Sequence, residues 1–385
     1  MPGQLETGLS SRAVTIVLAG GGTGGHLFPA LAVAEALNRL RPDVRLMFAG
    51  TKGRIEERVV PSYGYPFVSI WISGFQRGAL VSNLLLPLKI LVSLVQSLYL
   101  MLRQKPAVVV GTGGYVCGPV LFASSLLGIP TVLHESNSYP GITTRMLAGR
   151  VTKVFLGFED ARRWLPRTHA VTTVGTPTRA SIGVATRPEG IGTFRLDPDR
   201  PVVLVLGGSQ GAATINEAIF ALLEDLDREG AQLIWQTGER NFDSVMHRVG
   251  ERRVGWIGPF VAEMDRAYAA ADLVICRAGA TTIAELTCAA KPAVLIPYPH
   301  AAGNHQTRNA ESMARAGAAT IVAERELARL NAVVLDLLRS PSKRAAMGRA
   351  GATLAQPHAA ELIAKEVLDL ATQQSVRGHR STGAG

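Results

Sequence analysis

The chain has 385 residues, of which 47% are hydrophobic and 18% charged, and its formal net charge is +10. This length exceeds what one ordinary core fills, so we expect two domains of roughly 150 to 190 residues each. The hydrophobic content and the 40 glycines exclude a mostly disordered chain and are typical of α/β proteins. The basic excess fits nucleic acid, an anionic membrane or a phosphate-bearing ligand, but no nucleic-acid-binding pattern is recognisable, which argues against nucleic acid.

The three cysteines, Cys117, Cys276 and Cys288, are widely spaced, and none belongs to a CxxC pair. This pattern predicts a reduced protein without a bound metal. The first apolar stretch, residues 13–19, runs straight into glycines and follows an acidic residue and a late arginine. We interpret it as a strand and not as an export signal, and therefore expect a cytosolic protein.

Short apolar β-branched runs alternate with glycine loops and helical segments, which is the rhythm of parallel α/β folds. The runs are residues 13–19, 44–48, 107–110, 131–133 and 151–155, and then 202–206, 232–235, 272–276 and 293–296. We expect two Rossmann-like, doubly wound domains, residues 1–175 and 201–356, joined by a linker, residues 176–200. A helix over residues 357–372 returns to the first domain, and residues 373–385 form a disordered tail.

One segment between Arg77 and Lys105 is more apolar than its surroundings. Its polar members fall at helical spacing on one narrow stripe, which predicts an amphipathic helix: Ser82, Lys89, Ser93, Gln96 and Ser97. Pro87 and Lys89 divide the apolar run, so we do not expect it to span a membrane. It is either a core helix of the first domain or an interfacial patch whose basic residues meet anionic lipid headgroups.

The first glycine loop, residues 20–26 (GGGTGGH), lies between a strand and a helix predicted over residues 27–40. Its spacing fits neither the dinucleotide fingerprint nor a P-loop, so we expect no nicotinamide cofactor. Such a loop presents backbone amides and a helix N-terminus to a ligand. His26 is either an ordinary loop residue or a general base, because a neutral imidazole at this point can accept the proton of a sugar hydroxyl.

Two further polar strand ends, residues 111–115 (GTGGY) and 134–137 (HESN), would meet the first loop at the carboxyl edge of the sheet. That edge is the ligand crevice of open α/β folds, although tight packing alone would also explain the glycines. In the second half, residues 207–211 (GGSQG) suit a diphosphate held by backbone amides.

Glu285 has two readings. With Thr282 it forms the pattern of a capping box, or else its carboxylate grips two ribose hydroxyls. The loop of residues 297–306 is rich in amide and imidazole groups and suits sugar hydroxyls. Asp197 and Asp199 resemble a metal-diphosphate motif, but they lie beside Pro201 in the linker, and we interpret them as a turn.

Taken together and in this order, the motifs GGTGGH, GTGGY, HESN, GGSQGA, CRAGATTIAEL and NHQTRNA resemble the MurG family, over about residues 14–370. Members of that family are N-acetylglucosaminyltransferases that convert lipid I to lipid II in peptidoglycan synthesis. The resemblance implies a GT-B fold with a central cleft and inverting transfer from UDP-N-acetylglucosamine to a lipid-linked muramyl-pentapeptide. It also implies a peripheral position on the cytoplasmic face of the inner membrane, contact with anionic lipid and other cell-wall synthesis proteins, and no cofactor.

The resemblance carries roles to matching positions of this sequence. Glu285 would hold the ribose, and Val261 would meet the uracil through its backbone. The diphosphate would be served by Ser209, Thr281, Thr282 and Arg179, and the sugar by Asn137, Ala280, His305 and Gln306, with Thr23 and Gly24 completing the donor site. His26 would act on the acceptor, whose phosphates would meet the loops of Gly25, Gly113, Gly114 and Tyr115.

Two positions depart from the family pattern: Thr176 replaces a usual asparagine, and Gly303 replaces an acidic residue. Other functions remain compatible with the residues. These are another glycolipid glycosyltransferase, a UDP-sugar epimerase of the same fold, and a nucleotide-sugar sensor without catalytic activity.

Overall fold

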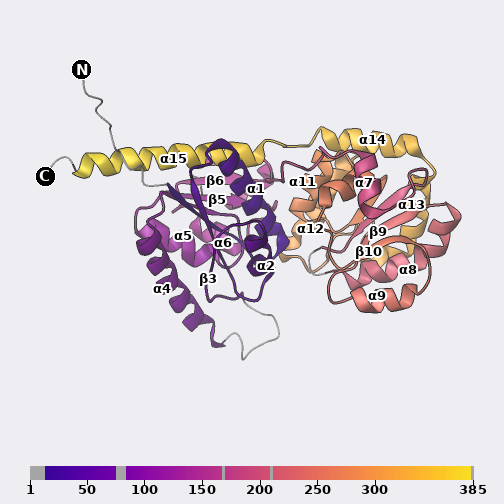
Figure 1. Cartoon of the computed structure of the whole chain (residues 1–385), viewed down its shortest axis with the longest axis horizontal. Coiled ribbons are helices and arrows are strands. Elements are labelled where there is room, and N and C mark those ends of the chain that lie inside the picture. Colours follow the sequence, from indigo (N-terminus) through magenta and orange to yellow (C-terminus); the bar gives the residue numbers. More distant parts are fainter. Residues whose placement is uncertain (1–13, 75–83, 167–169, 209–210, 383–385) are drawn as a thin grey trace, which may run out of the picture.

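The computed structural model describes residues 14–74, 84–166, 170–208 and 211–382. Two parallel sheets lie side by side, each covered by helices (Figure 1). The first has the strand order β3-β2-β1-β4-β5-β6-β7. Its strands are β1 (Thr15–Ala19), β2 (Arg45–Gly50), β3 (Phe67–Ser69), β4 (Val108–Gly111), β5 (Thr131–Glu135), β6 (Lys153–Leu156) and β7 (Val171–Thr173).

The second sheet has the order β10-β9-β8-β11-β12-β13. Its strands are β8 (Val202–Leu206), β9 (Gln232–Gln236), β10 (Gly255–Gly258), β11 (Leu273–Cys276), β12 (Ala293–Leu295) and β13 (Ala319–Ile321). The strand order reverses between β1 and β4 and again between β8 and β11, and the strand pairs are parallel. Both sheets are therefore Rossmann-like, and the predicted α/β fold class is confirmed.

The central strands were predicted because they are buried on both faces and read as apolar runs. Four strands were not predicted: β3, β7, β10 and β13, each at the edge of its sheet. Three of these four have only three residues, β3, β7 and β13. Because an edge strand is short and partly solvated, it leaves no continuous apolar run in the sequence.

The helices of the first domain are α1 (Gly24–Leu40), α2 (Ile55–Ser62), α4 (Leu86–Gln104), α5 (Cys117–Leu126) and α6 (Ile142–Leu147), with a 3₁₀ turn at Glu159–Trp164. The second contains α7 (Arg187–Phe194), α8 (Ala213–Arg228), α9 (Phe242–Val249), α10 (Met264–Ala270), α11 (Ala280–Cys288), α12 (His305–Arg315), α13 (Leu330–Leu338) and α14 (Pro341–Ala352). Helix α7 lies inside the predicted linker, but Ile191 and Phe194 are buried in the core of the second domain.

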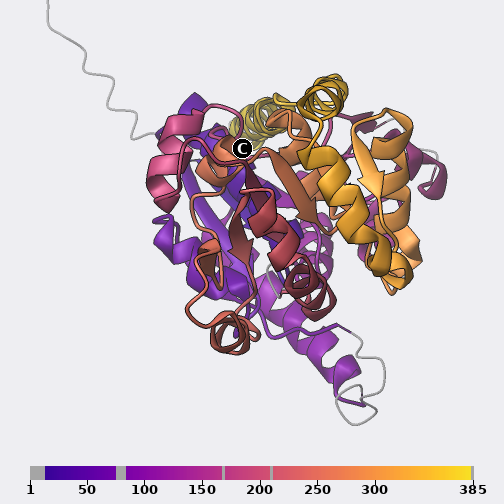
Figure 2. The ribbon, with the colours of Figure 1, turned by 90° about the vertical axis from the view of Figure 1, so that its right-hand side faces the viewer.

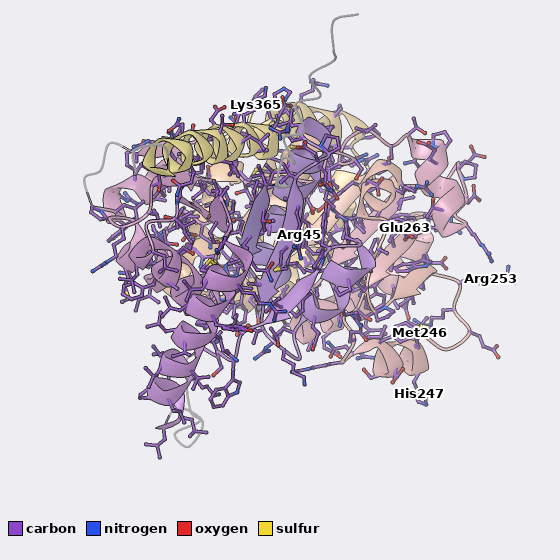
Figure 3. All side chains as sticks on the ribbon, turned by 60° about the vertical axis from the view of Figure 1, so that its left-hand side comes forward. Arg45, Met246, His247, Arg253, Glu263 and Lys365 are labelled. Atoms are coloured by element: carbon purple, nitrogen blue, oxygen red, sulfur yellow. The ribbon has the colours of Figure 1, made fainter. Side chains whose placement is uncertain are left out.

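Helix α15 (Ala359–Thr382) crosses back to the first domain, where it lies along the outside of that domain (Figure 1). Ile363, Ala364 and Val367 are buried in the core that α1 helps to form, whereas Lys365 lies on the outer face (Figure 3). The helix continues to Thr382, so the expectation of a disordered tail from residue 373 onward is wrong as far as Thr382. Polar residues such as glutamine and arginine extend a helix once packing has nucleated it.

Helix α4 projects from the body of the molecule (Figure 2) and packs against α5. Ser93 and Ser97 on its polar stripe are fully buried, and their hydroxyls donate to the carbonyls of Ile90 and Ser93. Leu91, Val95 and Tyr99, by contrast, are 61%, 58% and 62% exposed. The polar stripe of this helix therefore faces the protein, together with Leu100 and Met101 near its end, while a broad apolar face points outward.

Pro87 lies in the first turn of α4, so the helix begins beside this proline and does not continue through it from the preceding apolar residues. By length and composition alone, α4 could cross a membrane. Lys89 also turns toward the protein, where its Nζ donates to Ser73 Oγ at 2.9 Å. Arg77 and Ser82 lie outside the described residues.

Candidate active site in the cleft between the domains

A cleft of about 950 Å³ lies between the two sheets. The loops that follow β1, β5, β8, β11 and β12 contribute to its walls, so the carboxyl edges of both sheets face it. Helices α1, α8, α11 and α12 all begin at this cleft, and their N-terminal amides favour bound anions. The domains also touch, because the Thr281 hydroxyl donates to the Gly25 carbonyl at 3.2 Å.

Most of the predicted site residues line this cleft: Thr23, Gly24, Gly25, His26, Tyr115, Asn137, Arg179, Val261, Ala280, Thr281, Thr282, Glu285, His305 and Gln306. Ser209 lies outside the described residues. Gly113 and Gly114 are not among the lining residues; they lie behind the first loop. The fold therefore brings residues that are far apart in the sequence to one cleft. The role expected of each residue stays a prediction.

Gly113 and Gly114 make room for the first loop. A Cβ on Gly113 would lie 2.5 Å from His26 Cδ2, and one on Gly114 would lie 2.3 Å from the Gly21 carbonyl oxygen. Both glycines also have positive φ angles, +106° and +85°, which other residues rarely adopt. This second loop is therefore a close-packed support for His26.

His26 sits at the start of α1, where its Nδ1 is 3.3 Å from the Gly21 carbonyl oxygen and 3.4 Å from Thr23 Oγ1. Burial lowers the pKa of His26, and the nearby Glu135 carboxylate opposes this only in part. The imidazole is therefore neutral at about pH 7 and can accept a proton.

Glu135 fixes the loop that follows β5. Its carboxylate accepts hydrogen bonds from the backbone and side-chain amides of Asn137, from the Gly141 amide and from the Thr144 hydroxyl, at 2.7 to 3.2 Å. Asn137 is thus held at the cleft wall in one orientation. The neighbouring His134 is fully buried beside the Gly175 carbonyl, 3.0 Å from its Nε2, and burial lowers its pKa to about 4. His134 is therefore part of the fold and not a proton acceptor.

Glu285 faces the cleft from α11. It accepts a hydrogen bond from the Tyr268 hydroxyl at 3.1 Å and pairs with Arg179 at 3.4 Å. Helix α11 begins at Ala280 with Gly279 as its N-cap, so the capping-box reading of Thr282 and Glu285 is wrong. Burial raises the pKa of Glu285, and Arg179 opposes that rise. The guanidinium of Arg179 also lies over the Phe28 ring, 5.2 Å from its centre.

Sequence reasoning missed a cation that the second domain contributes to the cleft. Arg277 bonds Glu324 at 2.6 Å and the Thr214 hydroxyl at 2.9 Å, and it lies over the Tyr298 ring. The position of Arg277 directly after β11 was a usable signal, because strand ends meet at the ligand edge. Glu324 follows β13, an edge strand that the sequence did not reveal.

Gln236 was also missed, although it ends β9. Its side chain accepts from the Val261 amide at 3.2 Å and donates to the Gly208 carbonyl at 2.9 Å. The backbone contact expected of Val261 would therefore come from its carbonyl oxygen. Gln236 links the phosphate-type loop after β8 to the proposed base-binding end of the cleft.

The aspartate pair of the linker and one exposed histidine lie outside the cleft. Asp197 accepts from the Asp199 amide at 3.0 Å, which is the turn predicted for this pair. His247 is exposed on α9 and points away from the molecule (Figure 3). Within the described part of the chain, no three histidine, cysteine or acidic side chains gather as metal ligands do.

Residues 16–156 match the glycosyltransferase family 28 N-terminal domain, and residues 202–363 match the C-terminal domain of that family. With its two facing Rossmann-like domains, the protein is a glycosyltransferase of the GT-B fold. It is 46% identical to a Salinibacter ruber protein described as UDP-N-acetylglucosamine--N-acetylmuramyl-(pentapeptide) pyrophosphoryl-undecaprenol N-acetylglucosamine transferase, over 94% of this chain and 98% of that one. The chain therefore belongs to the MurG family.

Other comparisons agree. A Moorella thermoacetica protein with the same description is 41% identical over 92% of this chain and 98% of its own. The crystal structure of Acinetobacter baumannii MurG superposes with a TM-score of 0.69 at 29% identity, covering 93% of this chain and 99% of that one. A UDP-N-acetylglucosamine 2-epimerase superposes with a TM-score of 0.63 over 93% of this chain and 96% of that one, but at 13% identity this likeness shows the fold alone.

Proposed function

We propose that this protein transfers N-acetylglucosamine from UDP-N-acetylglucosamine to the 4-hydroxyl of the muramyl residue of undecaprenyl-pyrophosphoryl-MurNAc-pentapeptide. The observation that supports this best is the single cleft that receives His26 from one domain and Glu285 from the other. The names of the two relatives specify the same donor and acceptor.

The donor would lie mainly against the second domain. The Glu285 carboxylate would accept hydrogen bonds from the ribose, and the N-termini of α8 and α11 would meet the diphosphate. His305 and Gln306, in the first turn of α12, would contact the sugar together with Asn137 from the other wall. These groups orient the anomeric carbon toward the first domain.

The acceptor would approach from the side of the first glycine loop. His26 would take the proton of the acceptor hydroxyl while that oxygen forms a bond to the anomeric carbon. The bond from that carbon to the UDP oxygen breaks on the opposite face, and the electron pair leaves with UDP. The configuration is thereby inverted, and the helix N-termini and Arg179 stabilise the charge on the leaving diphosphate.

Incubation with labelled UDP-N-acetylglucosamine and a short-chain lipid I analogue tests this function. The expected result is a disaccharide-lipid product and one released UDP per transfer. Donor epimerised without an acceptor would support the epimerase, and donor binding without turnover would support the sensor. Either outcome would overturn the proposed transferase.

The protein would work at the cytoplasmic face of the inner membrane, docked through the outer side of α4. Its exposed leucines, valine and tyrosine offer a surface to the acyl region, and the exposed Arg103 and Lys105 offer charge to anionic headgroups. Trp71, which is 46% exposed, borders this face. The Lys89 ammonium lies over its ring, with Nζ 5.9 Å from the ring centre. The free cysteines fit a reducing compartment. Sedimentation with anionic vesicles tests this docking.

A further inference from the structure

Glu56, near the start of α2, is a buried carboxylate directly beneath the first glycine loop. Both of its oxygens lie 3.0 Å from the Gly22 amide nitrogen, and Oε1 also accepts from the Thr51 amide at 3.0 Å. A Cβ on Gly21 would lie 2.3 Å from Glu56 Oε1, so the loop can rest on the carboxylate only because this residue is glycine. The carboxylate therefore fixes the peptide unit that joins Gly21 to Gly22.

The same peptide unit also contacts His26. Its carbonyl oxygen, on Gly21, is 3.3 Å from His26 Nδ1, while its N–H, on Gly22, donates to Glu56. A carbonyl can only accept, so a hydrogen bond here places a proton on Nδ1 and leaves the lone pair of the neutral ring on Nε2. The Thr23 hydroxyl, 3.4 Å from the same nitrogen, is compatible with either tautomer. The Thr112 hydroxyl, which donates to the His26 carbonyl at 2.7 Å, holds the backbone on the other side.

We propose that Glu56 is a positioning residue for His26 and acts through the peptide bond between Gly21 and Gly22. The carboxylate accepts the hydrogen bond of the Gly22 N–H and polarises this peptide unit. The Gly21 carbonyl oxygen thereby becomes a stronger acceptor for the Nδ1 proton. The imidazole is then held in the tautomer whose Nε2 can receive a hydroxyl proton. The arrangement rests on the proposed base role of His26.

Glu56 is not the only charge near this ring. Glu135 and His134 on β5, and His305 at the start of α12, also face His26. Glu56 and Glu135 raise the pKa of His26, whereas His305 lowers it; between His26 and His134, the effect falls on His134, whose pKa is lowered. Loss of the Glu56 charge therefore lowers the pKa of His26 further, while the other three groups stay in place.

The variant Glu56→Gln tests this positioning role. It keeps the shape of the side chain and one oxygen that accepts from the loop amide, but it removes the negative charge. Glu57→Gln is the matched control, since Glu57 also accepts a loop amide, that of Gly53 at 2.6 Å, but does not reach Gly22. Glu56→Asp keeps the charge on a shorter side chain and should retain more activity than Glu56→Gln. Equal affinity for UDP in all three variants would show that the second domain is unchanged.

We expect Glu56→Gln to lower kcat about tenfold, a fraction of what loss of a general base costs. The acidic limb of its kcat/KM profile should move to lower pH. Imidazole ¹⁵N NMR of the whole protein without substrate should show the Nδ1–H tautomer of His26 less populated than in the native chain. An unchanged tautomer, or a kcat within twofold of the native value, would overturn the proposal.

The proposed role of His26 as general base is tested by a different variant. Near-normal turnover by His26→Ala would overturn the role of His26 in transfer. The NMR measurement on Glu56→Gln would still report whether the carboxylate controls the imidazole proton, because it involves neither donor nor acceptor.

Discussion

Arg179 and Glu285 form a buried ion pair at the cleft, with Nη2 of the arginine 3.4 Å from Oε1 of the glutamate. Glu285 belongs to α11 of the second domain, and the arginine at the same time covers the Phe28 ring of α1 in the first. Burial works against the charge of Arg179, but the Glu285 carboxylate and Tyr63 together outweigh it and hold the pKa of Arg179 above its ordinary value. Arg179, which is expected at the diphosphate, is thus ion-paired with Glu285, which is expected at the ribose.

Glu285→Gln should weaken UDP binding by about tenfold or more, because hydrogen bonds to a charged group contribute roughly 1.5 to 3 kcal/mol. Calorimetric titration with UDP measures this loss. The control is a dideoxy analogue that lacks both ribose hydroxyls. The native chain should discriminate strongly between the two nucleotides and the variant should not; equal discrimination by both would place the ribose elsewhere.

Arg179→Met should make stability depend on pH. Without the arginine, only the Tyr268 hydrogen bond opposes the effect of burial on Glu285, and the pKa of this carboxyl rises further above the value in the unfolded chain. A raised carboxyl pKa gives stability that is present at low pH and is lost as pH rises through the folded-state pKa. Chemical denaturation at pH 5 and pH 8 should therefore show a larger deficit at the higher pH. The double variant Arg179→Met, Glu285→Gln should lose this difference.

Gly303→Ala should slow transfer by about tenfold, because small displacements of groups that orient a substrate cost this much or more. A Cβ there would lie 2.2 Å from the ring of Tyr139, which stands 4.9 Å from Trp164 and beneath Arg308 of α12. The added methyl group would therefore push α12, with His305 and Gln306, away from the loop of Asn137.

Gly317→Ala is the control, since Gly317 also has a positive φ, +74°, but open space where its Cβ would lie. It should cost about 1 to 2 kcal/mol of stability with normal turnover. Equal kinetic effects of the two substitutions would show that backbone strain, and not contact with Tyr139, slows the reaction.

His134 should contribute to unfolding in acid. Its folded-state pKa of about 4 lies below the ordinary value of 6.5, so its contribution is complete above pH 6.5 and is lost as pH falls toward 4. The loss amounts to about 3 kcal/mol for a buried group with this shift. Against His134→Gln, whose amide can still donate to Gly175, the stability advantage of the native chain should shrink over this range. A constant difference would contradict the assignment.

The central strands and the loops after them could be predicted because burial on both faces makes an apolar run, and the glycines that follow mark the ligand edge. The cleft residues followed from the same rule and from the family motifs. The edge strands could not be predicted, and neither could Glu324, whose partner Arg277 lies 47 positions earlier in the chain. Ion pairs between distant segments leave no local pattern.

The sequence also could not predict which face of α4 packs against the protein. The spacing of Ser93 and Ser97 revealed a polar stripe on α4, but spacing does not state which side faces the protein. Small hydroxyls can be buried because the carbonyls of their own helix accept their protons. The role of Glu56 could not be predicted either. Glu56 and Glu57 stand together in the first turn of a helix, where acidic residues are ordinarily explained by their favourable interaction with the helix dipole.

The outward face of α4 should make vesicle binding sensitive to substitutions there and insensitive to equally exposed apolar residues elsewhere. Leu91→Ser combined with Val95→Ser should reduce the affinity for anionic vesicles, measured by sedimentation, by about a hundredfold, since each buried aliphatic side chain contributes roughly 1.5 to 3 kcal/mol of transfer free energy. Val184→Ser is the control, because Val184 is 72% exposed but lies outside α4. Transfer to a short-chain, water-soluble acceptor should stay normal in all variants. Undiminished binding of the α4 variant would show that the membrane is met by another surface.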